Sequence, residues 1–290
     1  MLKPDKPEWL KKSAPNPAVL NRIKEFTDRL GLHTVCENAC CPNVGECFSR
    51  GVATFMIMGD ICTRDCTFCA VNNGYPLPFD VNEPGNVVTA IKELGLRHAV
   101  ITSVTRDDLP DGGARHFAAV VKAIRNYDSA VITEILVPDF CGSFQALEIV
   151  ILSRPAIINH NVETVPRLYP SVRPQADYKR SITLLENVKT NGEGILTKSG
   201  LMLGMGEKRA EVKRVMEDLR EVGCDLLTIG QYLSPSPRHY EVRGFIPPEE
   251  FEEYRNIANA LGFKKVASAP YVRSSFDADK MVVLVNSFNG

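Results

Sequence analysis

The feature that most constrains the fold is an alternation, beyond residue 50, of apolar, β-rich runs with segments of helical periodicity. Strand–helix alternation of this kind indicates βαβ units and a parallel sheet. Periodicity alone leaves open a doubly wound sheet and a barrel, complete or partial. The predicted strands are Thr54–Met58, Ala99–Val104, Val131–Val137, Ala156–Asn161, Gly200–Leu203 and Leu226–Ile229. The predicted helices are Pro17–Leu30, Val87–Leu94, Ala114–Asn126, Ser143–Leu152, Tyr178–Thr190, Glu207–Val222 and Pro248–Leu261.

Polar residues fall where these predicted strands end, namely Ser103, Thr105, Glu134, Asn159, Asn161 and Gln231. In a βα barrel, the rim at the carboxyl ends of the strands is the catalytic face. We therefore favour an α/β fold, a partial (β/α)6 TIM-type barrel over residues 51–263. Residues 1–50 and 264–290 are then an N-terminal and a C-terminal extension.

The composition is that of a globular protein, with 44% apolar and 24% charged residues among 290. A net charge of −1 argues against a nucleic-acid binder. No apolar run approaches the length of a membrane span, and the first residues lack the apolar core of a secretory signal. We therefore expect a cytoplasmic protein, in which the nine cysteines serve as metal ligands more readily than as disulfides.

Two cysteine triples carry the chemistry. Cys62, Cys66 and Cys69 follow the first predicted strand as C-x3-C-x2-C, and Cys36, Cys41 and Cys47 precede it as C-x4-C-x5-C. Zinc is the alternative metal for these cysteines, but the second C-x-x-C pair that would complete a tetrahedral zinc site is missing. Two four-iron clusters offer eight iron-ligand positions, of which the two triples fill six. One iron of each cluster therefore lacks a thiolate, and an open iron at the barrel rim predicts an active site.

The C-x3-C-x2-C motif resembles that of the radical S-adenosylmethionine enzymes. The upstream triple resembles the lipoyl synthase family within them, as do three further stretches: "TSVTRDDLPDGGA" (Thr102–Ala114), "NHNVETV" (Asn159–Val165) and "RSSF" (Arg273–Phe276). The resemblance extends from about Trp9 to Phe276, where the family often has a tyrosine.

The resemblance implies two [4Fe-4S] clusters and S-adenosylmethionine. Cys62, Cys66 and Cys69 would hold the cluster whose open iron binds the amino and carboxylate groups of the cofactor, with Phe68 against its adenine. Cys36, Cys41 and Cys47 would hold an auxiliary cluster in the two extensions, with Ser275 as its fourth ligand and Ser274 as the alternative. Cys40 is interpreted as a bystander. The auxiliary cluster would be consumed as the sulfur source.

Further cofactor contacts are expected at the rim. The resemblance places Asp107, Gly112 and Gly113 near the methionine end of the cofactor, although such a sequence is also typical of a plain turn. Glu134 is interpreted as a ribose contact, with an ion pair to a core arginine as the alternative. Asn161 lies on an inward face of its strand, whereas His160 points away and is interpreted as structural. Arg173 either holds a cofactor carboxylate or forms a surface ion pair.

The resemblance implies insertion of sulfur at C6 and C8 of an octanoyl chain on a lysine of a lipoyl carrier domain. The carrier is the E2 component of a 2-oxoacid dehydrogenase or the H protein of glycine cleavage. An electron donor such as ferredoxin or flavodoxin and cluster assembly proteins are further expected partners, whereas nucleic acid and membrane are not. Two alternatives remain: a tRNA methylthiotransferase, although no basic RNA-binding domain is visible, and a non-catalytic iron–sulfur or zinc protein.

Overall fold

The computed structural model describes residues 6–11, 17–35, 43, 54–275 and 278. Cys36, Cys40, Cys41, Cys47 and Phe276 lie outside these residues. The predictions made for them are therefore carried forward untested.

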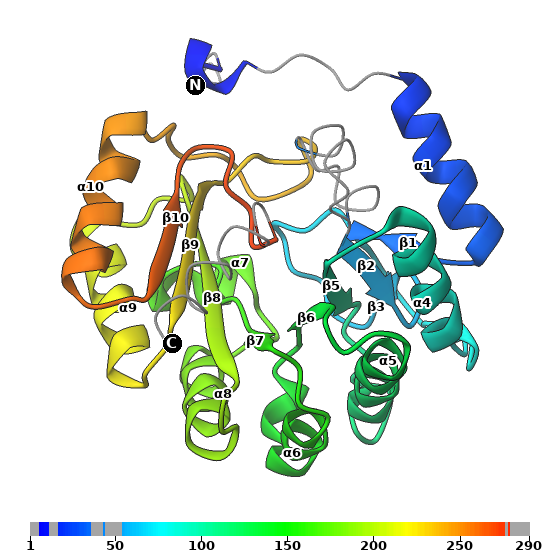
Figure 1. Ribbon diagram of the computed structural model, residues 1–290. Coiled ribbons are helices and arrows are strands. Elements are labelled where there is room, and N and C mark those ends of the chain that lie inside the picture. The colour runs from blue at the N-terminus through cyan, green and yellow to red at the C-terminus, as the bar shows by residue number, and fades with distance from the viewer. Residues whose placement is uncertain (1–5, 12–16, 36–42, 44–53, 276–277, 279–290) are drawn as a thin grey trace.

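One curved sheet forms the centre of the fold (Figure 1). Its strands follow the order β1 (His33–Thr34), β2 (Thr54–Ile57), β5 (His98–Ser103), β6 (Ile132–Leu136), β7 (Ile157–Asn159), β8 (Leu196–Leu203), β9 (Leu226–Gln231) and β10 (Lys265–Ser268). All neighbours from β2 to β10 are parallel, and β1 is antiparallel to β2. The sheet ends at β1 and β10 without closing, so the predicted partial barrel is confirmed.

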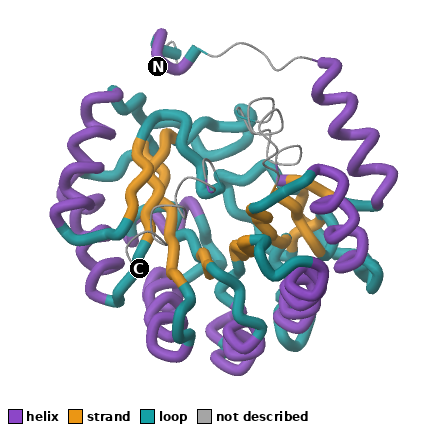
Figure 2. The backbone as a smooth tube through the Cα atoms, in the orientation of Figure 1, coloured by secondary structure: helices purple, strands orange, loops and turns teal. Residues whose placement is uncertain are grey.

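Helices cover the outside of this sheet (Figure 2). The long ones are α1 (Pro17–Leu30), α4 (Glu83–Leu94), α5 (Ala114–Tyr127), α6 (Phe144–Leu152), α8 (Tyr178–Asn191), α9 (Arg209–Glu221) and α10 (Pro248–Ala260). Each predicted helix is confirmed, with ends within about four residues. Short elements are α7 (Tyr169–Val172), the 3-10 turns Glu8–Leu10, Phe140–Gly142 and Pro166–Leu168, and the strand pair β3 (Ile61–Cys62) and β4 (Asn72–Asn73). In the described part of the chain, no helix is long and apolar enough to cross a membrane.

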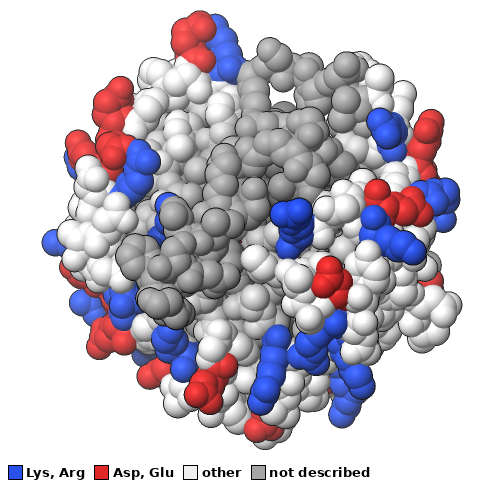
Figure 3. Space-filling view, in the orientation of Figure 1, with Lys and Arg blue, Asp and Glu red and all other residues white. Residues whose placement is uncertain are grey.

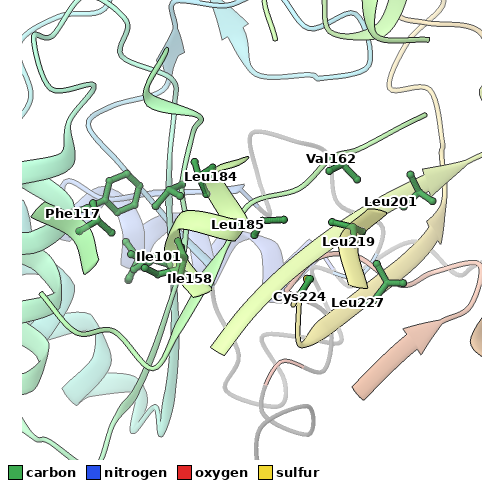
Figure 4. Close-up of a cluster of buried hydrophobic side chains, with 14 of the residues drawn as sticks. Ile101, Phe117, Ile158, Val162, Leu184, Leu185, Leu201, Leu219, Cys224 and Leu227 are labelled. Carbon is green, nitrogen blue, oxygen red and sulfur yellow. The ribbon is translucent and has the colours of Figure 1, made fainter. Parts of the chain in front are cut away.

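The core lies between the sheet and the outer helices (Figure 4). Ile101 and Ile158 of the strands and Phe117 and Leu185 of the helices are fully buried in it. Cys224 belongs to the same cluster at 0% exposure, and burial raises the pKa of its thiol to about 12. Its interpretation as a small apolar core residue is confirmed.

The strand β10 was not predicted. It pairs in parallel with β9 and continues the barrel sheet past residue 263, where the sequence analysis ends the barrel. Only Val266 and Ala267 of its four residues are apolar, and it lies at the edge of the sheet, so it carries little hydrophobic pattern. The boundary expected at residue 263 therefore falls inside the sheet.

Candidate active site

A cavity of about 580 Å³ is lined by residues of the barrel strands and of the loops that follow their carboxyl ends. Its volume is in the range of cofactor and ligand sites. Of the predicted site residues, it is lined by Cys62, Cys66, Phe68, Cys69, Asn161, Arg173 and Ser275. The structure does not bring Asp107, Gly112, Gly113 or Glu134 to the cavity wall.

The three cysteines lie in the cluster loop, residues 62–69, which follows β2. The pairing of β3 with β4 starts this loop, and the Thr67 amide donates to the Val172 carbonyl at 3.0 Å. Cys62 Sγ accepts the backbone N–H groups of Arg64 and Thr105, each at 3.4 Å. Such donors stabilise a thiolate, which is the form that binds iron.

Burial raises the pKa of the Cys66 thiol, and it raises that of Cys69 to about 12. Without a cation, both groups are therefore neutral thiols at pH 7. Bound iron would supply the charge that holds them as thiolates. Three soft donors at one wall of a roomy cavity fit a four-iron cluster with one open iron.

Arg64 holds the cluster loop through buried ion pairs. Its Nε and Nη2 donate to Asp107 at 2.7 and 3.0 Å, and Nη2 also donates to Asp139 at 2.6 Å. Burial would raise the pKa of Asp139, but Arg64 outweighs it and lowers that pKa to about 2. No role was predicted from the sequence for Arg64 or Asp139. The sequence does offer one signal for Arg64, which lies between Cys62 and Cys66. A loop that buries its cysteine thiols also buries the adjacent side chains, so a charged residue there needs a partner of opposite charge.

Asp107, Gly112 and Gly113 have structural roles outside the cavity wall, and their expected cofactor contacts stay predictions. Asp107 is engaged by Arg64, and the two glycines form the turn that precedes α5, with φ angles of +57° and +86°. A Cβ at Gly113 would lie 2.3 Å from Met58 Sδ. These glycines therefore serve backbone conformation and close packing, which supports the alternative of a plain turn.

Glu134 forms a core ion pair, but with a lysine in place of the arginine of the alternative, and its ribose contact stays a prediction. This residue has 0% exposure, and its Oε1 accepts from Lys198 Nζ at 2.8 Å and Asn159 Nδ2 at 3.2 Å. Burial alone would raise its pKa, but Lys198 and His98 outweigh it and lower that pKa to about 2. Glu134 is therefore a charged partner of a buried lysine inside the barrel.

Asn161 and Arg173 face the cavity together. Arg173 Nη1 donates to the Asn161 carbonyl at 3.0 Å, and Asn161 Nδ2 donates to Glu163 Oε1 at 3.0 Å. Arg173 is only 9% exposed, so it forms no surface ion pair. Its buried Nε has no hydrogen-bond partner among the described residues and is available to an acidic ligand.

His160 lies between two cavity asparagines but is satisfied by the protein. Its Nδ1 donates to the Val137 carbonyl at 2.8 Å, and its Nε2 lies 3.0 Å from Ser181 Oγ. Burial and the charge of Arg173 lower its pKa to about 4, so the imidazole is neutral at pH 7. Its interpretation as a structural histidine is confirmed.

The two serines of the C-terminal segment, residues 272–275, differ. Ser274 accepts from Asn159 Nδ2 at 2.7 Å and donates to Asn161 Oδ1 at 2.9 Å. Ser275 lines the cavity, and no hydrogen bond joins its hydroxyl to another residue in the described part of the chain. Ser275 is thus the serine whose oxygen is available to a metal.

Residues 56–219 match the model of the radical SAM superfamily. Lipoyl synthase of Caldanaerobacter subterraneus subsp. tengcongensis is 56% identical over 274 residues, which cover 94% of this chain and 96% of that protein. Lipoyl synthase of Caldicellulosiruptor saccharolyticus is 51% identical and covers 98% of this chain and 100% of that protein. The chain belongs to the lipoyl synthase family. It is accordingly a sulfur-inserting radical SAM enzyme.

Solved structures agree with the fold of this lipoyl synthase family member. Methylornithine synthase superposes with a TM-score of 0.54 at 12% identity, over 81% of this chain and 80% of that one. Streptococcus suis SuiB bound to its precursor peptide gives 0.58 at 11% identity, over 91% of this chain and 57% of that one. At such identities the likeness concerns the fold alone. The relatives do not favour the tRNA methylthiotransferase and non-catalytic alternatives.

Proposed function

We propose that this enzyme inserts sulfur at C6 and C8 of an octanoyl chain carried on a lysine of a lipoyl carrier domain. One observation carries the proposal beyond family membership. The cavity is lined both by the three cysteines of the radical SAM motif and by Ser275, which lies more than two hundred residues further along the chain. A radical source and a second metal ligand would thus share one cavity.

Cys62, Cys66 and Cys69 would hold the first [4Fe-4S] cluster together with S-adenosylmethionine. Once bound and reduced, this pair supplies a 5′-deoxyadenosyl radical able to take hydrogen from an unactivated C–H bond. The chain itself would orient the cofactor: Phe68 offers an aromatic face to adenine, and Arg173 offers its unpartnered Nε to an acidic group.

The rest of the cavity suits a hydrocarbon chain. Val100, Val104, Leu136, Leu201, Met202 and Val272 contribute to its wall. Such side chains exclude water, which protects a carbon radical from side reactions. The open edge of the partial barrel would admit a chain tethered to another protein.

Cys36, Cys41, Cys47 and Ser275 would hold an auxiliary cluster that is consumed as the sulfur source. Cys40, Cys141 and Cys224 are scattered and give no sign of a persulfide relay. An oxygen ligand is a poorer match than a thiolate for cluster iron, so the iron at Ser275 would be the easiest to lose. The cluster held by these four residues would supply the sulfur.

The proposal extends to partners and location. The substrate would be the octanoylated E2 or H protein, with ferredoxin or flavodoxin as reductant and assembly proteins to rebuild the auxiliary cluster. Residues 1–50 and 264–290 would supply the ligands of that cluster around the barrel. Of the nine cysteines, the six that would bind iron must stay reduced to serve as thiolate ligands, so we propose the cytoplasm, where thiols are kept reduced.

The test is isotopic. Both clusters are reconstituted with heavy sulfide, only light sulfur is left in solution, and the protein is incubated with an octanoyl-lysine peptide, reductant and S-adenosylmethionine. Two heavy sulfurs in one product molecule are expected. Ser275→Ala should still form 5′-deoxyadenosine but should yield little product. Light sulfur in the product would refute the auxiliary cluster as the source.

A further inference from the structure

The hydroxyl of Ser274 joins two distant parts of the fold. It accepts a hydrogen bond from Asn159 Nδ2 at 2.7 Å and donates one to Asn161 Oδ1 at 2.9 Å. A serine hydroxyl has a single hydrogen to donate, and here that hydrogen is used. The C-terminal segment is thereby fixed to the end of β7, 113 to 115 residues earlier in the chain.

Each asparagine is in turn held by a carboxylate. Asn159 Nδ2 also donates to Glu134 Oε1 at 3.2 Å, which the buried Lys198 holds at 2.8 Å. Asn161 Nδ2 donates to Glu163 Oε1 at 3.0 Å. The two amides therefore present a donor on one side of Ser274 and an acceptor on the other. This arrangement selects a hydroxyl at residue 274.

Two glycines make room for this arrangement. A Cβ at Gly200 of β8 would lie 2.7 Å from Asn161 Oδ1, and a Cβ at Gly230 of β9 would lie 2.0 Å from the Val272 carbonyl oxygen. Neither glycine has the positive φ that side chains avoid. Because glycine weakens a strand interior, its presence at both positions is best explained by the lack of room for a Cβ.

The backbone before Ser274 is held from two further sides. Gln231 N donates to the Pro270 carbonyl at 3.1 Å, and Asn43 Nδ2 donates to the Tyr271 carbonyl at 2.7 Å. Asn43 is 1% exposed and lies in sequence between Cys41 and Cys47 of the upstream triple. The two residues before the C-terminal segment are thus bonded to the barrel and to Asn43, which lies in sequence within the upstream cysteine triple.

We propose that Ser274 is a positioning residue that fixes Ser275 at the cavity, with Asn159 and Asn161 as its anchors and Gly200 and Gly230 as the space it needs. The role of Ser275 as an iron ligand rests on the proposed function. The anchoring of the segment does not. Ser275 has no hydrogen bond of its own among the described residues, so the position of its oxygen depends on the residue before it.

The first measurement is amide hydrogen exchange of residues 270–275 in the full chain, with and without reconstituted clusters. Ser274→Ala should speed exchange about fivefold or more, because it removes the hydrogen bonds of the hydroxyl. Gly230→Ala should do the same, because its Cβ would clash with the Val272 carbonyl and displace the segment. Ser274→Thr keeps the hydroxyl and should restore slow exchange. Ser268→Ala removes a buried serine bond to the Phe251 carbonyl outside the cavity, and Gly244→Ala meets no atom within 4 Å. Both controls should match the parent chain.

The second measurement concerns the auxiliary cluster alone, in a chain in which Cys62, Cys66 and Cys69 are all alanine. After mild oxidation, the fraction of clusters that lose one iron is read from the three-iron signal in electron paramagnetic resonance. This fraction should rise several-fold in Ser274→Ala, as in Ser275→Ala, and should return to the parent value in Ser274→Thr.

Unchanged exchange in Ser274→Ala would overturn the proposal. So would a parent-like cluster signal in Ser274→Ala alongside an altered signal in Ser275→Ala. If Ser275→Ala itself leaves the signal unchanged, the ligand assignment in the proposed function fails. Exchange then decides alone: faster exchange in Ser274→Ala supports the anchor, and unchanged exchange refutes it.

Discussion

The cluster loop and the C-terminal segment line the same cavity but are held there by different interactions. The cluster loop is held by charge, because Arg64 is shared between Asp107 and Asp139 in a site where its side chain is 5% exposed. The C-terminal segment is held by neutral hydrogen bonds of Ser274 and by close packing against Gly230.

This difference predicts different resistance to opening. Breaking a buried ion pair leaves an uncompensated charge, whereas a neutral hydrogen bond contributes only about 1 kcal/mol net. We expect the cluster loop to be the fixed wall of the cavity and the C-terminal segment to be the wall that opens more readily. The exposed charges differ from the buried pair of Arg64, because on the face shown in Figure 3 the Lys and Arg side chains are interspersed with Asp and Glu side chains.

The largest expected effect is loss of cofactor cleavage when the cluster loop loses its cysteines while the C-terminal segment is unchanged. Replacing Cys62, Cys66 and Cys69 together with alanine should abolish 5′-deoxyadenosine formation, because no thiolate remains to hold the cofactor's cluster. About four iron atoms per chain should remain, in line with one other cluster. Iron analysis and chromatography of the reaction check this, and full cofactor cleavage in that variant would end the assignment.

The next prediction tests the ion pairs that hold the cluster loop. Arg64→Ala should lower the free energy of unfolding by about 3–5 kcal/mol, since it leaves Asp139, at 1% side-chain exposure, without its main partner. Chemical denaturation of the cluster-free chain measures the loss.

Arg167→Ala is the matched control. It also removes a bidentate arginine–carboxylate pair, to Glu211, but that arginine is 49% exposed. Its loss should affect stability far less, because water already screens the pair. Equal losses in the two variants would contradict the proposed difference between the walls.

The barrel and its thiols were predictable because their signals are local. Strand and helix periodicity depends on neighbouring residues, and cysteine spacing depends on a single loop. The strand β10 escaped prediction because an edge strand of four residues has almost no pattern to read.

The polar contacts around the cavity were not predictable to the same degree. Glu134 could be recognised as a carboxylate in an apolar strand, but its partner Lys198 comes from β8, 64 residues later. Asp107 could be recognised as part of a polar loop, but Arg64 engages it from 43 residues earlier. Sequence shows which groups need partners, and only the fold decides whether a ligand or another side chain provides them.

A third prediction concerns the residues that anchor the C-terminal segment. His160 lies between the two asparagines that anchor Ser274, and its folded pKa of about 4 lies below the usual 6.5. The unfolded chain therefore binds more protons between these values, so stability is lost as pH falls from 6.5 to 4. The loss attributable to this group should reach about 3 kcal/mol.

Denaturation curves across this range check the prediction. His160→Gln should be less stable at pH 7, because the bonds to Val137 and Ser181 are disturbed. It should also show a correspondingly smaller loss toward pH 4. An identical slope in both chains would exclude His160 as the cause.

The smallest expected effect lies before the cluster loop, where Met58, the residue after β2, packs against Gly113. Gly113→Ala combines a φ of +86° with a Cβ placed 2.3 Å from Met58 Sδ, a flexible side chain that can move. The free energy of unfolding should fall by about 1–2 kcal/mol, chiefly from the strained backbone. Affinity for S-adenosylmethionine in the reconstituted enzyme, measured by equilibrium dialysis, should stay within about twofold, since the cavity wall is not touched. Gly112→Ala, at φ +57° in the same turn, is the matched variant and should behave alike. Loss of cofactor binding in either variant without a matching loss of stability would restore the cofactor contact that the sequence predicted.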